Sequence, residues 1–330
     1  GKKPIKSTYL IHKANFVACH TPAYIRKFNI VQEIVDGGTF LLNCPWSVEE
    51  LEKEIPGQVK KYIYDHKIKF YIINGSKIGV EVGMGPTRIN TILQSAFFKL
   101  AKIIPEADGI NFMKAAAEKT YGRKGQDVVQ KNWNAIDAGA DPKNLIEVQI
   151  PESWKDAQDE GLNYEKAVNG PKEVLDFVNK IQYMVNSQQG NKVPVSETLP
   201  YTDGSTPAGT SAYEKRGIAV EVPSWKPDKC IQCAVCSYVC PHGAIRPVAM
   251  TEEEAANVPE GMIFVELKGM NNGYKFGIVI SALDCTGCGS CVAECPGNKQ
   301  GDHDTLKLGP IGENMYEQKF FDYAVTLPDK

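Results

Sequence analysis

The chain has 330 residues, of which 42% are apolar and 23% charged, as is usual for a globular protein of two or three domains. Its formal net charge of −3 gives no electrostatic footprint for nucleic acid or an anionic membrane surface. No apolar run approaches the roughly 18 residues of a membrane span, and the first residues do not form a signal-peptide pattern. We therefore expect a cytoplasmic protein without nucleic-acid or membrane partners.

Residues 1–186 alternate between strand and helix signals, which predicts an α/β domain with a layered, mostly parallel sheet. Short apolar runs predict strands at 16–20, 39–44, 69–75 and 145–150. Ser47 and Glu50 have the spacing of a helix capping box. Apolar spacing predicts helices at 47–55, 87–104, 111–120, 124–138 and 173–185.

Residues 187–221 are rich in Gly, Pro, Ser and Thr and predict an extended connector without a large core of its own. Residues 222–330 predict an α+β domain built around a cysteine repeat. Between the two cysteine groups we expect a short helix at 251–258. A hairpin of 262–269 and 274–283 should follow, turning at Gly269 to Gly273.

Eight of the ten cysteines fall into two copies of the spacing C-x2-C-x2-C-x3-C-P, ending at Pro241 and Pro296. This spacing is typical of ferredoxins with two [4Fe–4S] clusters, in which the fourth cysteine of each run ligates the other cluster. The predicted ligands of cluster one are Cys230, Cys233, Cys236 and Cys295. The predicted ligands of cluster two are Cys285, Cys288, Cys291 and Cys240.

Zinc and disulfides are the alternatives for these cysteines. A structural zinc site usually pairs two C-x2-C knuckles, which leaves no use for a third and fourth cysteine in each group. Disulfide frameworks belong mostly to small secreted domains. Cys19 and Cys44 stand at the ends of apolar strand candidates, so we expect them to be small buried hydrophobic residues and not ligands.

Other candidate sites carry weaker signals. The turn Gly83–Arg88 precedes a predicted helix, where an anion could bind, although Pro86 is also an ordinary helix start. The five histidines, His12, His20, His66, His242 and His303, form no catalytic arrangement. His242 follows Pro241 and could tune a cluster potential. No thiamine-binding motif is present, so we predict no catalytic residue in this chain.

Three segments resemble the long single-chain pyruvate:ferredoxin (flavodoxin) oxidoreductases. Residues 7–150, with "NFVACHTPAYI" and "GPTRINTILQSAFFKLAKIIP", resemble the later part of that family's gamma-type domain. The stretch "SAYEKRGIAVEVPSW" is similar to its EKR connector, and the cysteine repeat is similar to its two-cluster ferredoxin domain. The resemblance implies that the chain is an internal piece of a larger polypeptide. Residues 1–186 would be the gamma-type domain without its first part, residues 187–221 the EKR connector, and residues 222–330 the two-cluster ferredoxin domain.

The resemblance implies an enzyme that oxidatively decarboxylates pyruvate with coenzyme A. Electrons would pass through the two clusters of this chain to ferredoxin or flavodoxin. Thiamine diphosphate, Mg²⁺ and a third [4Fe–4S] cluster would belong to the remaining domains of the same polypeptide, which would form a homodimer. Two alternatives stay open: a non-catalytic electron-transfer subunit of another oxidoreductase, and an enzyme for a different 2-oxoacid.

Overall fold

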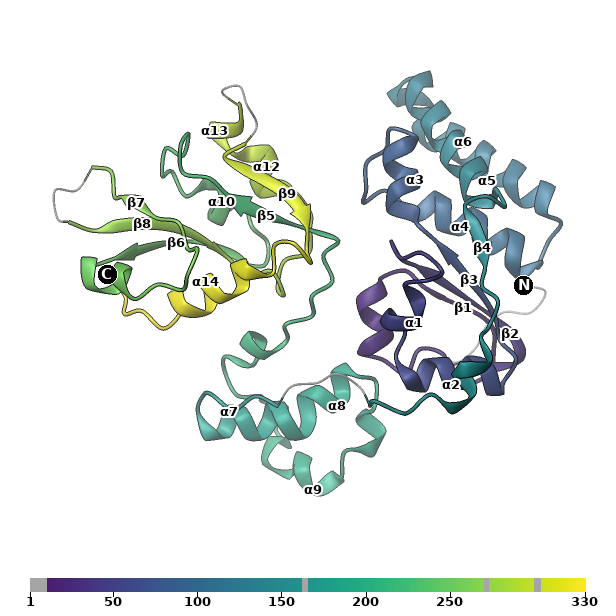
Figure 1. The fold of residues 1–330 in the computed structure, drawn as a ribbon, viewed down its shortest axis with the longest axis horizontal. Coiled ribbons are helices and arrows are strands. Elements are labelled where there is room, and N and C mark those ends of the chain that lie inside the picture. Colours follow the sequence, from purple (N-terminus) through teal and green to yellow (C-terminus); the bar gives the residue numbers. More distant parts are fainter. Residues whose placement is uncertain (1–10, 162–165, 270–272, 300–303) are drawn as a thin grey trace. The chain divides into compact units, whose positions relative to one another are not determined.

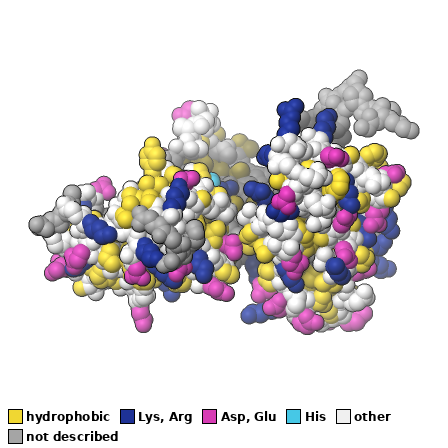
Figure 2. Space-filling view, turned by 90° about the horizontal axis from the view of Figure 1, so that it is seen from above, with side chains coloured by type: hydrophobic (Ala, Val, Ile, Leu, Met, Phe, Trp, Pro, Cys, Tyr) yellow, Lys and Arg dark blue, Asp and Glu magenta, His cyan; other side chains and the backbone are white. Residues whose placement is uncertain are grey.

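The computed structural model describes residues 11–161, 166–269, 273–299 and 304–330, and the chain divides into two compact units between Ala208 and Gly209 (Figure 1). This division lies inside the predicted connector, whose limits at 187 and 221 stay a prediction. No helix within the described ranges is long and apolar enough to cross a membrane. Basic and acidic side chains both occur on each unit on the face that Figure 2 shows.

The first unit is built on a four-stranded sheet with the order β1-β2-β3-β4. The strands are β1 (Ala14–Cys19), β2 (Ile34–Asn43), β3 (Lys69–Ile73) and β4 (Leu145–Glu147). The first three strands are parallel, and the short β4 pairs antiparallel with β3. The predicted mostly parallel sheet is therefore confirmed.

The second half of β2 and most of β3 are largely buried on both faces, which explains the continuous apolar runs at residues 40–42 and 70–73. Along β2, Phe40 and Leu42 face one core, which also contains the indole of Trp154. Leu41 points the other way, with Ile73 of β3, into a second core. This alternation is the two-residue period of a strand.

The helices of this unit are α1 (Leu51–Glu54), α2 (Gly57–Asp65), α3 (Gly75–Glu81), α4 (Asn90–Ala101), α5 (Glu106–Tyr121), α6 (Gln126–Ala140), α7 (Lys172–Phe177), α8 (Tyr183–Asn186) and α9 (Val195–Thr198). A π-helical turn at Val178–Gln182 joins α7 to α8, inside the helix predicted at 173–185. The helix predicted at 87–104 begins only at Asn90, because Gly83 and Gly85 have φ of +75° and +87° and hold the preceding residues in a turn.

Helices α4 and α6 pack closely at Gly139. A Cβ atom at this position would lie 2.2 Å from the carbonyl oxygen of Ile92 on α4. The hydroxyl of the fully buried Ser95 donates to the carbonyl oxygen of Ile136 at 2.5 Å, again between these two helices. The absence of a side chain at Gly139 therefore sets the spacing of the layer that covers the second core.

The second unit contains two small antiparallel sheets, β5-β9 and β6-β8-β7. Its strands are β5 (Glu221–Trp225), β6 (Ile245–Met250), β7 (Val265–Glu266), β8 (Lys275–Ile280) and β9 (Leu306–Pro310). Its helices are α10 (Val235–Tyr238), α11 (Glu252–Ala256), α12 (Ser290–Glu294), α13 (Pro296–Lys299) and α14 (Tyr316–Ala324).

Two similar halves make up this unit. Strand β5, a cysteine loop, α10 and β6 form one half, and β8, a cysteine loop, α12 and β9 form the other. The first strand of each half pairs with the last strand of the other, as a pseudo-two-fold relation requires. The predicted ferredoxin-like α+β fold is confirmed. The predicted hairpin is present as β7 and β8, although its turn at 270–272 lies outside the described residues.

Candidate metal centre

All eight cysteines of the repeat lie in the second unit, at corresponding places in its two halves. The first two cysteines of each run occupy the loop between a strand and a short helix, and the third, Cys236 or Cys291, lies inside α10 or α12. The fourth cysteine, Cys240 or Cys295, follows the helix. Each run therefore presents thiols from both ends of its helix.

The eight thiols surround two separate cavities. The first cavity is lined by Cys230, Cys233, Cys236 and Cys295. The second cavity is lined by Cys240, Cys285, Cys288 and Cys291. Each cavity receives three thiols from one run and the fourth thiol from the other run. This grouping is the one that the sequence predicts for the two ligand sets, while iron binding by each thiol stays a prediction.

The cavity walls are apolar, which suits a bulky inorganic group bound by thiolates. Trp225, Ile278 and Leu306 line the first cavity, and Ile245 and Ile280 line the second. No three His, Cys, Asp or Glu side chains among the described residues converge on a single metal ion. Four thiols that surround a cavity without converging on one point therefore suit a group of several atoms better than one zinc ion.

The two cysteine loops have the same backbone conformation. Gln232 and Gly287, two residues after the first cysteine of each run, have φ of +60° and +70°. Ala234 and Gly289, two residues further on, have φ of +56° and +75°. This left-handed backbone turns N–H groups toward the sulfur atoms, and the amides of Gln232 and Gly287 each donate to the first thiol of their run at 3.4 Å.

Neighbouring segments hold the two loops in different ways. A Cβ atom at Gly287 would lie 2.9 Å from the carbonyl oxygen of Glu221, so the second loop has no room for a side chain there. In the first loop the side chain of Gln232 donates to the carbonyl oxygen of Glu266 and accepts from the amide of Lys268, both at 2.8 Å. The ammonium group of Lys268 also donates to the carbonyl oxygen of Cys230 at 2.9 Å.

Burial disfavours the charged form of several of these thiols. It raises the pKa of Cys236 to about 11 and that of Cys291 to about 12, and it raises the pKa of Cys285. A hydrogen bond with Ser290 lowers the pKa of Cys288 instead. Thiolates in such an apolar site need a cationic partner, which iron supplies when it displaces the thiol protons. The donor set therefore fits [4Fe–4S] clusters.

Cys19 and Cys44 lie in the core of the first unit, in a different unit from the other eight cysteines. Their side chains are 1% and 3% exposed. Burial raises the pKa of Cys19 to about 12 and that of Cys44 to about 11. The thiol of Cys19 donates to the carbonyl oxygen of Thr21 at 3.2 Å. This packing supports the structural role that we predict for both residues.

The predicted histidines are scattered. His12 and His66 form surface pairs with Glu33 and Asp36 at 3.2 and 2.6 Å. His20 is exposed, and His303 lies outside the described residues. His242 is exposed and contributes to the rim of the second cavity.

The turn Gly83–Arg88 contributes to a wide, open groove. The lining residues include Thr87, Arg88, Asn90, Thr91, Tyr121 and Lys124. The buried hydroxyl of Thr91 has no hydrogen-bond partner among the described residues. Two cationic side chains and several donors thus line one groove. The sequence pattern indicates only the turn Gly83–Arg88 and not the contribution of Tyr121 and Lys124.

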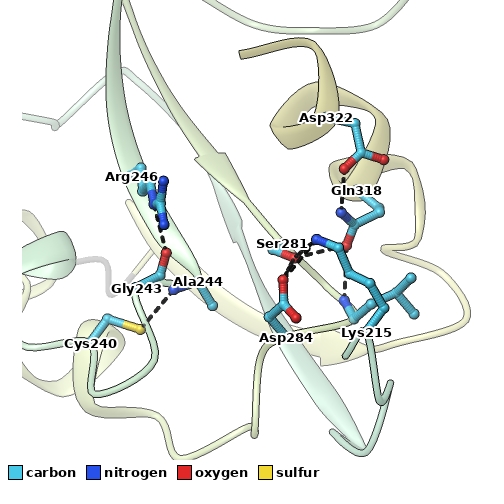
Figure 3. A network of polar contacts seen from close by, with 10 residues as sticks. Lys215, Cys240, Gly243, Ala244, Arg246, Ser281, Asp284, Gln318 and Asp322 are labelled. Carbon is cyan, nitrogen blue, oxygen red and sulfur yellow. Dashed lines mark hydrogen bonds and ion pairs between the residues drawn. The ribbon is translucent and has the colours of Figure 1, made fainter. Parts of the chain in front are cut away.

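One polar contact beside the second cavity was not predicted from the sequence. Lys215, in the predicted connector, forms an ion pair of 2.8 Å with Asp284, the residue just before Cys285 (Figure 3). Nothing in the local sequence pairs these residues, which are 69 positions apart. The only signal available was the alignment of the two repeats, which sets Asp284 of the second run opposite Lys229 of the first.

Family models match three successive segments of the chain, and related proteins align over its whole length. Residues 1–141 match the family "Pyruvate ferredoxin/flavodoxin oxidoreductase", and residues 229–299 match a "4Fe-4S dicluster domain". Between them, residues 163–219 match the family named EKR, described as a domain of unknown function.

Three related proteins align over 100% of this chain. A pyruvate-flavodoxin oxidoreductase of Enterobacter agglomerans is 40% identical, and a pyruvate:ferredoxin oxidoreductase of Moorella thermoacetica is 41% identical. The chain spans 27% of the length of each. A pyruvate dehydrogenase (NADP⁺) of Cryptosporidium parvum is 39% identical, and the chain spans 18% of its length.

The family matches follow the order of the chain's segments, and the dicluster match encloses all eight cysteines of the two cavities. Residues 1–141 therefore belong to the family "Pyruvate ferredoxin/flavodoxin oxidoreductase" and residues 229–299 to the 4Fe-4S dicluster domain, and the whole chain is similar to a section that makes up 27% of the pyruvate:ferredoxin and pyruvate-flavodoxin oxidoreductases named above.

Proposed function

We propose that this chain is the electron-transfer portion of an enzyme that oxidises pyruvate and coenzyme A to acetyl-CoA and carbon dioxide. The observation that carries the proposal is the pair of four-thiol cavities, each built from both cysteine runs. Two [4Fe–4S] clusters held side by side form a path along which single electrons pass. The names of the related proteins indicate the substrate class.

In this proposal the ligand sets are the thiols that line each cavity. Cluster one is held by Cys230, Cys233, Cys236 and Cys295. Cluster two is held by Cys285, Cys288, Cys291 and Cys240. When bound, such clusters accept and release one electron at a time with little change in shape. The backbone amides that point at the thiols stabilise negative charge. Cys236, Cys291 and Cys295 are buried, whereas Cys233 and Cys288 are exposed.

The remaining chemistry belongs to other parts of the proposed polypeptide. Thiamine diphosphate with Mg²⁺ would form the carbanion, and a third [4Fe–4S] cluster would deliver electrons to the two clusters of this chain. We expect a cytoplasmic homodimer whose acceptor is ferredoxin or flavodoxin. A relative whose name specifies NADP⁺ makes a nicotinamide-linked acceptor the alternative to test.

The groove beside the turn Gly83–Arg88 is our candidate for part of the coenzyme A site. Arg88 and Lys124 line it, and a phosphate of coenzyme A is the anionic group that two cations and nearby hydroxyl and amide donors would bind. Arg88→Gln should raise the KM for coenzyme A by about tenfold, with kcat nearly unchanged, because one charge-assisted contact is lost. The exposed Arg123, outside the groove, is the control. An unchanged KM in the Arg88 variant would remove the groove from the proposal.

The activity test uses the complete native polypeptide, purified without oxygen. Reduction of a viologen dye is measured with pyruvate, 2-oxoglutarate or indolepyruvate, each with and without coenzyme A. The proposal predicts reduction that requires both pyruvate and coenzyme A. Preference for another substrate would identify a different 2-oxoacid enzyme. Inertness towards all three, with two clusters present, would favour a separate electron-transfer subunit. Parallel assays with ferredoxin, flavodoxin and NADP⁺ identify the acceptor.

A further inference from the structure

A polar network fixes the segment that leads into the second cysteine run. Lys215 comes from the EKR match, and its ammonium group contacts the carboxylate of Asp284 at 2.8 Å and the hydroxyl of Ser281 at 3.2 Å (Figure 3). That hydroxyl also lies 2.6 Å from the Asp284 carboxylate. The amide of Cys285 donates to the carbonyl oxygen of Ser281 at 3.0 Å, so the first thiol of the run follows directly from the fixed turn.

Helix α14 supports the same segment from another side. The side-chain carbonyl of Gln318, which is 6% exposed, accepts the amide proton of Leu283 at 3.0 Å and lies 3.1 Å from the Ser281 hydroxyl. The amide of Gly217, two residues after Lys215, donates to the carbonyl oxygen of Leu283 at 2.8 Å. The EKR segment and α14 therefore hold the approach to Cys285 together.

The network also extends toward Cys240, the thiol that the other run contributes to the second cavity. Arg246 donates to the carbonyl oxygen of Gly243 at 2.9 Å, and the next amide, of Ala244, donates to the Cys240 thiol at 3.3 Å. Lys215 and Arg246 each lie 5.2 Å from the ring of Phe321 on α14. One aromatic ring thus positions two cations that support the two sides of the second cavity.

The charges next to the two cysteine runs are opposite in sign. Lys229 precedes the first run, and Lys268 contacts the carbonyl group of Cys230. Asp284 precedes the second run. A carboxylate next to an anionic cluster disfavours the addition of an electron, because like charges repel. Lys215 is the cation that offsets this carboxylate, and the two side chains are only 29% and 25% exposed, so water screens them incompletely.

We propose that Lys215 is a positioning residue for cluster two, holding the turn before Cys285 and neutralising Asp284, so that cluster two keeps a potential at which it accepts electrons. This inference rests on the proposed ligand assignment. It gives the EKR segment a defined task in electron transfer, which is to set the redox balance between the two clusters.

The test is a redox titration of the complete polypeptide, followed by electron paramagnetic resonance, which reports the two clusters separately. The variants are Lys215→Met, Asp284→Asn, their combination and Lys215→Arg. Lys215→Met should lower the midpoint potential of cluster two. At a fixed applied potential, the ratio of reduced to oxidised cluster two should fall about tenfold relative to cluster one, which corresponds to about 59 mV for one electron. Asp284→Asn should shift the potential upward, and the double variant should return near the wild type. Lys215→Arg should shift it least among the single variants.

Two controls keep the outcomes separable. Lys226→Met removes a pair of similar geometry, 2.7 Å from Asp304, and should leave cluster two unchanged. If the wild-type protein lacks two clusters, the proposed function itself fails. If both clusters are present and the two single variants do not move the potential of cluster two in opposite directions, this inference is wrong.

If Lys215→Met loses cluster two altogether, the double variant shows whether the missing counter-charge is the cause. Retention of the cluster when Asp284 is also neutralised supports the role of Lys215 as the counter-charge. Loss in the double variant as well overturns it.

Discussion

Glu317 on α14 is buried without a cationic partner in the described structure, and it should make the stability of this chain depend on pH. Its side chain is 4% exposed, and burial raises the pKa of its carboxyl group to about 8, although a hydrogen bond with the Trp225 backbone opposes this shift. The ordinary value is near 4.5. The folded protein therefore keeps this group neutral at pH values where the unfolded chain ionises it.

The sign of the effect follows from this difference. Below about pH 4 the carboxyl group is protonated in both states and costs nothing. As pH rises through 4 toward 8, ionisation stabilises only the unfolded state, so the free energy of unfolding falls, and it levels off above pH 8. At ~1.4 kcal/mol for each pH unit, the loss between pH 5 and pH 8 is about 3 to 4 kcal/mol.

Glu317→Gln keeps the shape of the side chain and removes this ionisation. We expect the variant to match the wild type near pH 5 and to be more stable at pH 8 by about 3 to 4 kcal/mol. Urea unfolding, followed by circular dichroism under anaerobic conditions at pH 5, 6.5 and 8, measures the difference. Exchange of the exposed Glu313 for Gln is the control and should not change the pH profile. Equal slopes for Glu317→Gln and the wild type would refute the reasoning.

Three further predictions follow from packing. Gly139→Ala should lower the free energy of unfolding by more than about 2 kcal/mol, because the added methyl group meets the backbone of the facing helix. Gly122→Ala, where no atom lies within 4 Å of the added group, is the control and should be nearly neutral. Thermal unfolding measures both. Gly287→Ala should reduce the iron content by about one cluster. Gly289→Ala should retain both clusters, because an added Cβ atom there lies 3.6 Å from its nearest neighbour and the first run already has alanine at the corresponding position. Replacing both cysteines of the first unit by alanine should leave the iron content unchanged, and a loss of iron would reject their structural role.

The sequence predicts those parts of this chain that local patterns determine. A continuous apolar run such as residues 70–73 is enough for a buried parallel strand, and the cysteine spacing is enough for a dicluster domain. Strand β6 was not predicted, because Arg246 and Pro247 interrupt its apolar pattern, and pairing with β8 determines it instead. Helix α3 was missed because Gly75 and Gly79 lower its helix propensity. Gly79 is nevertheless suited to this position, because a Cβ atom there would lie 2.4 Å from the carbonyl oxygen of Gly85.

The candidate site divides in the same way. The grouping of thiols follows from spacing, because each run has a fixed local geometry. The left-handed conformations of Gln232 and Ala234 are not favoured by their residue types and are seen in the sequence only by aligning them with Gly287 and Gly289. The pair of Lys215 with Asp284 depends on tertiary packing between distant segments, which no local pattern contains.

The central claim is that the two cysteine runs exchange their fourth ligands, and single thiol replacements test it most directly. Cys233→Ala and Cys288→Ala serve as references, because each belongs to the first three cysteines of its own run. Cys240→Ala and Cys295→Ala are then compared with them by electron paramagnetic resonance of the reduced complete polypeptide. We predict that Cys240→Ala perturbs the same cluster signal as Cys288→Ala, and that Cys295→Ala perturbs the same signal as Cys233→Ala. If Cys240→Ala instead matches Cys233→Ala, each run holds its own cluster and the account is wrong.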